Sequence, residues 1–106
     1  MNIVVFITAK DKKEGEKIAW HLLDKKLAAC VNIMPEVESF FWWEGKIDQS
    51  KEVLLIVKSK KILFSKIVKA VREVHSYSVP EIIALPVVAG FKNYLEWINN
   101  SVQKGK

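Results

Sequence analysis

Apolar residues follow two different patterns at the start of the chain. Residues 2–9 are continuously apolar and rich in β-branched side chains, which is typical of a short strand buried on both faces. Residues 11–26 instead carry apolar side chains at intervals of three and four, and Asp11 and Glu14 have the spacing of a helix-capping box. The pattern therefore predicts a strand followed by an amphipathic helix over 11–26.

Two extended runs follow, separated by a short loop that contains glycine. The first covers residues 28–34, and Pro35 should bulge it or end it, because proline cannot donate to a strand ladder. Residues 36–43 alternate enough to continue as an extended arm. The turn at 44–46 then leads into residues 47–58, and two such runs around a short loop predict a β-hairpin.

The next part of the chain is predicted to form a second helix and a fourth strand. Ser59 is placed to cap that helix, and residues 76–80 cannot continue it, because proline disfavours helical geometry in the residue before it. Residues 81–88 are expected to form the strand, in which Pro86 argues for an edge position or a bulge.

A last helix opens at Asn93 and Glu96, which have the spacing of another capping box. The order β-α-β-β-α-β-α predicts an α+β, ferredoxin-like split β-α-β sandwich with an extra C-terminal helix, in one domain over 1–106. Both crossover helices then pack on one face of an antiparallel sheet. Because residues 3–7 and 53–57 are apolar at odd and even positions alike, the second face must also be covered, which predicts association of copies through the sheet.

Length and cysteine content suit one soluble domain. The chain has 106 residues, half of them hydrophobic, and no apolar run approaches the ~18 residues of a membrane helix. The first residues lack the features of a signal peptide. A single cysteine, Cys30, forbids an internal disulfide and fits a reducing compartment. We therefore expect a cytoplasmic protein without a membrane partner.

The formal charge of +5 does not by itself indicate nucleic-acid binding. Sixteen of the seventeen basic residues are lysines scattered along the chain, and Arg72 is the only arginine. Recognition of phosphates and base edges favours the arginine fork. The lysines are therefore interpreted as a solvated face, and no nucleic-acid partner is expected.

Three known uses of this topology fail on residue content. An RNA-recognition module needs stacking aromatics on its central strands, and residues 51–58 contain none. An acylphosphatase-type enzyme needs an arginine in a phosphate-binding loop, which residues 8–11 lack. A ferredoxin needs several cysteine ligands, and Cys30 stands alone.

A few side chains could still support chemistry. Cys30 lies in an apolar strand, where cysteine is more often an inert small hydrophobe than a nucleophile. His75 ends a helix, where a lone histidine is usually a cap favoured by the helix dipole. With Glu81 these residue types would suit copper or zinc, although their spacing matches no local metal motif. His21 is interpreted as a surface residue, and the aromatics of 40–43 either cover a neighbouring subunit or line a pocket.

Several short segments, taken in order, resemble the CutA family of divalent-cation tolerance proteins over nearly the whole chain. They are Leu27 to Asn32, Trp42 to Ile47, Lys51 to Val53 with Lys58, His75 to Ile82, and Tyr94 to Trp97. The resemblance implies a ferredoxin-like subunit in a compact homotrimer, with sheets edge to edge around a threefold axis. It also implies a link to tolerance of copper and other divalent metals, and no catalytic reaction.

The resemblance further implies sites in clefts between subunits. Carried over residue by residue, it gives Cys30, His75 and Glu81 as candidate metal ligands. It gives Trp43, Lys58 and Tyr77 as candidate cleft lining. The metal would be Cu(II) or another divalent cation, and none is required.

Two departures from the family pattern argue against tight copper binding. The family commonly has proline between the histidine and the tyrosine, where this chain has Ser76, and this loosens the loop. Residues 6–9 contain no cysteine, which removes one thiolate ligand. A weak site based on histidine and carboxylate is what the sequence supports. Two alternatives stay open: a PII-like signalling or binding trimer with an organic anion near Lys58, and an enzyme that uses Cys30 as nucleophile.

Overall fold

The computed structural model describes residues 1–105 and contains the predicted order of elements. The strands are β1 (Asn2–Ala9), β2 (Cys30–Trp43), β3 (Lys46–Lys60) and β4 (Ile82–Pro86), and the helices are α1 (Lys12–Asp24), α2 (Phe64–Val74) and α3 (Lys92–Ser101). A short 3-10 turn, η1 (Lys61–Leu63), precedes α2. No helix within residues 1–105 is both long enough and apolar enough to span a bilayer.

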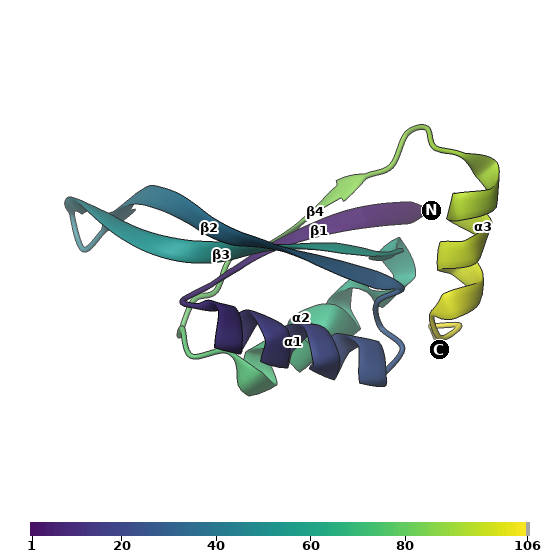
Figure 1. Cartoon of the computed structure of the whole chain (residues 1–106), viewed down its shortest axis with the longest axis horizontal. Coiled ribbons are helices and arrows are strands. Elements are labelled where there is room, and N and C mark those ends of the chain that lie inside the picture. Colours follow the sequence, from purple (N-terminus) through teal and green to yellow (C-terminus); the bar gives the residue numbers. More distant parts are fainter. Residues whose placement is uncertain (106) are drawn as a thin grey trace.

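The four strands form one antiparallel sheet in the order β2-β3-β1-β4. Helices α1 and α2 both lie below this sheet, whereas α3 stands at its end beside the N-terminus (Figure 1). This is the predicted split β-α-β arrangement. The predicted edge position of the strand that carries Pro86 is confirmed, because β4 pairs only with β1.

The two faces of the sheet differ in burial but not in hydrophobicity. Val5, Leu55 and Val57 face the helices and are fully buried. The neighbouring positions Phe6 and Ile56 are paired with one another, face away from α1 and α2, and are only half-buried. We call this second surface the open face. Its apolar side chains are Val4, Phe6, Met34, Leu54, Ile56, Ile83 and Leu85.

The predicted capping box at the start of α1 is confirmed with one change. Asp11 accepts a hydrogen bond from the backbone N–H of Glu14 at 2.8 Å. The side chain of Glu14 accepts a hydrogen bond at 3.2 Å from the backbone N–H of Lys10, whereas a standard capping box would use the N–H of Asp11. One residue later, Gly15 lets α1 approach β3 closely, because a Cβ there would lie 3.0 Å from Cγ2 of Val53.

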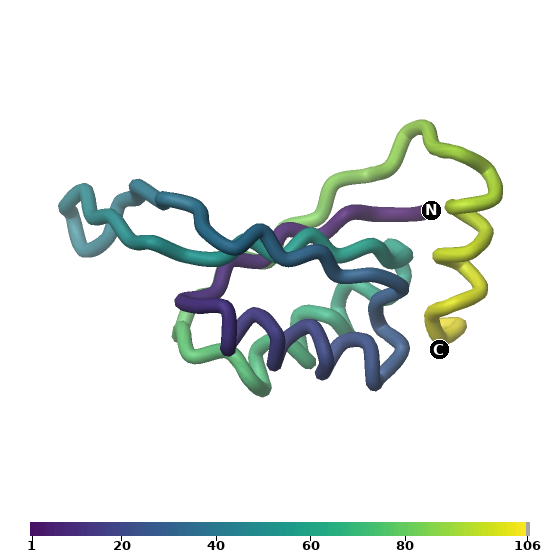
Figure 2. Tube along the Cα trace, viewed as in Figure 1, coloured from purple at the N-terminus to yellow at the C-terminus, as the bar shows by residue number. Residues whose placement is uncertain are grey.

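Strands β2 and β3 form a long hairpin that extends beyond the helices (Figure 2). The predicted irregularity at Pro35 is present as a register shift between Met34 and Val37, after which β2 continues. At the tip, Glu44 and Gly45 have φ values of 50° and 79°. Positive φ at both turn positions matches the twist of the flanking strands.

Two predicted helix caps are wrong. Ser59 belongs to β3, which remains paired with β1 as far as Lys60, and its buried hydroxyl donates to the carbonyl of Leu27 at 2.7 Å. The last helix begins at Lys92 after Phe91, with no side-chain cap, so Asn93 already lies inside the first turn. The fourth strand is also shorter than the predicted range of 81–88.

Candidate functional site

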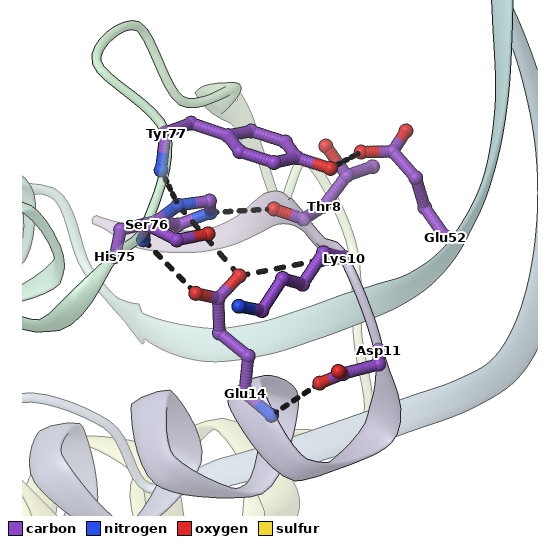
Figure 3. Close-up of polar contacts among 8 residues, drawn as sticks. All are labelled: Thr8, Lys10, Asp11, Glu14, Glu52, His75, Ser76 and Tyr77. Atoms are coloured by element: carbon purple, nitrogen blue, oxygen red, sulfur yellow. Dashed lines mark hydrogen bonds and ion pairs between the residues drawn. The ribbon is translucent and has the colours of Figure 1, made fainter.

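His75 connects the end of α2 to strand β1. It is the C-cap residue of α2, with φ −84° and ψ 139°, so the chain turns away from the helix at this point. Its Nε2 lies 2.8 Å from the carbonyl oxygen of Thr8, and its Nδ1 accepts the backbone N–H of Tyr77 at 3.0 Å (Figure 3). This pairing requires the proton on Nε2. Because the ring is fully buried and both nitrogens are bonded, His75 holds residues 75–77 against the sheet.

Glu14 anchors the same loop from the first turn of α1. Its Oε2 accepts the N–H of Ser76 at 2.9 Å, and its Oε1 lies 3.9 Å from Nδ1 of His75. Burial acts to raise the pKa of this carboxyl, but hydrogen bonds from Ser76 and from the N–H of Lys10 lower the pKa below 4.5. The carboxylate is thus held ionised inside the protein.

Tyr77 follows His75 and contacts strand β3. Its hydroxyl donates to Oε2 of Glu52 at 2.8 Å, and its ring lies 4.8 Å from the imidazole, centroid to centroid. Burial, followed by the hydrogen bond and charge of Glu52, raises the pKa of Tyr77 to about 12. Glu52 is only 7% exposed, and a buried carboxylate needs a hydrogen-bond donor from the protein. The phenol of Tyr77 is that donor.

A broad groove of about 990 Å³ opens beside this pair. One wall is the loop 77–81, and the other is the hairpin at 38–43 and 48–50. Burial and the nearby charge of Glu52 raise the pKa of Glu81 in this groove. Three of the sequence-predicted candidates therefore line one groove: Trp43, Tyr77 and Glu81.

The other candidates lie elsewhere. Cys30 and Lys58 are paired on the open face, with Lys58 Nζ 4.0 Å from the thiol sulfur and hydrogen-bonded to Asn32. Tyr94 of α3 lies against this cluster, and burial and then Cys30 raise its pKa. Lys58 is six residues along β3 from Glu52, which places the two clusters ~20 Å apart.

The candidate metal ligands are therefore not assembled within one chain. Cys30 lies at the far end of the open face from Glu81, and both nitrogens of His75 are already bonded. Within residues 1–105, no three His, Cys, Asp or Glu side chains are grouped so that they could hold a metal ion. The residues of a single chain do not fit a metal centre.

Sequence reasoning gave Glu14 only a helix-capping role and gave Glu52 none, although both residues hold the loop in place. The available signal was weak: an acidic residue in a capping box and another beside the apolar run at 53–57. It also gave none to His21, whose Nε2 lies 3.0 Å from Oε1 of Glu73 and joins α1 to α2.

Comparison with known proteins adds family information. The model of the family described as CutA1 divalent ion tolerance protein matches residues 3–101. The divalent-cation tolerance protein CutA of Archaeoglobus fulgidus is 47% identical over 103 residues, covering 97% of this chain and 100% of that protein. The chloroplastic CutA 1 protein of rice is 45% identical over 103 residues, covering 97% of this chain but only 58% of the rice protein.

Solved structures agree with these matches. The divalent cation tolerance protein from Thermus thermophilus has a TM-score of 0.95 at 39% identity, covering 97% of this chain and 100% of that one. The Archaeoglobus fulgidus protein, described as periplasmic, has a TM-score of 0.94 at 46% identity, with the same two coverages. These relatives are thus described as chloroplastic in one case and periplasmic in another.

Proposed function

Since this chain belongs to the CutA1 family of divalent ion tolerance proteins, we propose that it acts in tolerance of divalent metal ions as a homotrimer, without catalysing a reaction. The family is named for tolerance and not for catalysis. The observation that carries the proposal is the open face together with the groove beside Tyr77. The single free cysteine supports a reducing, cytoplasmic location.

The apolar open face is the reason to expect assembly. Phe6 and Ile56 lie at its centre, yet α1 and α2 cover only the opposite face. Contiguous exposed apolar surface of this kind marks an interface between proteins. Both β2 and β4 are edge strands, so copies can join edge to edge around an axis, and their open faces then turn inward and cover one another.

A metal site would then form between copies. Because Cys30, His75 and Glu81 are not grouped within one chain, donors from neighbouring chains must combine. Glu81 is the side chain best placed to take part. It lines the groove beside Glu52, and a bound cation would relieve the repulsion between these two carboxylates. Oxygen donors of this kind give weak binding of Cu(II) or of another divalent cation.

Calorimetry of metal binding tests this proposal. Wild-type protein at ~100 µM should release heat with Cu(II) or Zn(II), and Glu81→Gln should weaken binding about tenfold. Glu16→Gln removes the same charge from the exposed side of α1 and should leave binding unchanged. Absence of heat above the buffer blank, or equal binding by all three proteins, would contradict a metal site in the groove.

The hydrogen bonding of His75 favours one alternative function, which is that of a signalling or binding trimer without a functional metal. Because both ring nitrogens are bonded within the chain, the imidazole has no free lone pair for a metal. The ligand would then be an organic anion attracted to Lys58 beside Cys30. A crystal structure of the trimer with ligand density against Lys58 of one copy and Trp43 of another, and without metal, would support this alternative. Copper at Glu81 would exclude it.

A further inference from the structure

The net positive charge of this protein comes from one layer of the fold. Segments 10–26 and 61–74, which contain α1, η1 and α2, hold ten of the seventeen basic and five of the twelve acidic residues. The rest of the chain holds seven of each and is neutral. The whole formal charge of +5 therefore belongs to these two segments, which we call the basic helix layer. It lies on the side of the sheet opposite the open face (Figure 1).

An exposed indole lies within this layer. Trp20 is 74% exposed on α1, although tryptophan is usually largely buried. Lys17 and Leu23, one turn away on either side, are also exposed, and Lys13 lies one turn further towards the N-terminus. The core-facing side of the same helix is formed by other residues, including Ile18 and Leu22. Most of the indole surface is therefore not packed against residues 1–105, and covering the open face would leave it exposed.

We propose that the basic helix layer is a docking surface for an acidic protein segment that packs an apolar side chain against Trp20. Tryptophan is enriched among residues that dominate protein interfaces, where a polar rim surrounds an apolar anchor. Lys13 and Lys17 provide part of that rim, and the net positive charge of the layer attracts an acidic partner electrostatically. The proposal does not depend on metal binding or on the trimer.

The pattern of charges around Trp20 favours a polypeptide over a phosphate surface. Glu16 and Asp24 lie four residues to either side of Trp20 and are exposed on the same side of α1. Both would repel the uniformly charged phosphates of a nucleic acid or an anionic bilayer at the point where the indole must make contact. A polypeptide can combine acidic groups opposite Lys13 and Lys17 with an apolar side chain opposite Trp20.

Fluorescence anisotropy with a labelled peptide tests the surface. The probe is a fluorescein-labelled synthetic peptide of repeated Glu-Glu-Leu-Phe units, which should bind the wild-type protein with a Kd of ~10–100 µM at low salt and more weakly as salt increases. Trp20→Ala should weaken binding about tenfold. The double variant K13E/K17E should weaken it at least as much. The matched control K46E/K51E makes the same charge change on the hairpin and should bind nearly as well as the wild type.

Each other outcome would overturn the proposal. No binding by the wild type removes the docking surface. Equal losses in the two double variants mean attraction by net charge alone, and full binding by Trp20→Ala means that the indole is not the anchor. Binding to phosphatidylglycerol vesicles or to single-stranded DNA that depends on Trp20 as strongly as peptide binding does would assign the surface to phosphates. Because the substituted side chains are exposed, circular dichroism should show unchanged folding in every variant.

Discussion

The hydroxyl of Tyr77 lies 2.8 Å from Oε2 of Glu52 and joins the loop after α2 to the middle of the long hairpin. These residues are 25 positions apart in the chain, and their contact sets one end of the groove. Behind Tyr77, the imidazole of His75 holds the loop on Thr8 of β1. This wall of the groove is therefore fixed by partly buried hydrogen bonds to β1 and β3.

The first prediction concerns alkaline pH. Because the pKa of Tyr77 is about 12 in the folded protein and 10.0 for an ordinary tyrosine, its neutral form stabilises the folded protein below pH 10, and this stabilisation is lost as pH rises through about 12. Titration followed by ultraviolet absorbance should show tyrosine ionisation near pH 12. Tyr77→Phe should abolish that step, whereas Tyr94→Phe should keep it. A single tyrosine transition near pH 10 in the wild type would contradict the buried bond to Glu52.

The second prediction concerns acid pH and Glu14. Its pKa is lowered in the folded protein, so the ionised carboxylate stabilises the fold above pH 4.5, and that stabilisation is lost as pH falls below this value. Glu14→Gln should lower the free energy of unfolding by ~1–2 kcal/mol at neutral pH, because bonds from two backbone N–H groups lose their charged acceptor. Urea unfolding at several pH values should show this difference shrinking below pH 4.5. Glu16→Gln on the exposed face of α1 is the control. If the unfolding free energies of wild type and Glu14→Gln differ by the same amount at all pH values, the ionisation of Glu14 does not contribute to stability.

The third prediction concerns the burial of His75. His75→Ala removes the partner of the Thr8 carbonyl and of the Tyr77 N–H, and leaves a void, so unfolding should become easier by ~2–4 kcal/mol. His21→Ala, at the partly exposed contact with Glu73, should cost less than ~1 kcal/mol. Thermal unfolding would rank the two variants. Equal stabilities would mean that His75 is not locked in the folded protein.

Most of the fold could be predicted because its signals are local. The apolar run at 2–9 and the capping box at Asp11 depend on neighbouring residues, and the strand and the helix start that they predict are both confirmed. Ser59 shows the limit of this approach. A serine after a strand can cap a helix or bond to a distant carbonyl, and here Leu27, 32 residues earlier, provides that acceptor. Only the packed fold decides between these two partners.

The site could be predicted only in part for the same reason. Trp43, Tyr77 and Glu81 were candidates and do line one groove. Their support comes from Glu14, which binds the N–H of Ser76 across 62 residues, and no periodicity carries that information. The grouping of Cys30 with His75 and Glu81 rested on residue type and on the family resemblance, and the sheet places Cys30 at its other end.

The last prediction concerns assembly. Ile56 lies on the central strand β3, opposite Phe6, in the middle of the open face. Wild-type protein should sediment at low micromolar concentration as one species of about three times 12.2 kDa, because burial of apolar surface drives association. Ile56→Lys should shift this species to smaller mass, since an unpaired ammonium would be buried at the interface. Leu85→Lys, on the edge strand β4, provides a second test if the first variant folds poorly. Ile62→Lys introduces the same charge on η1, away from the open face, and should leave the mass unchanged. A stable, folded single chain in the wild type would show that the open face is not covered by other copies.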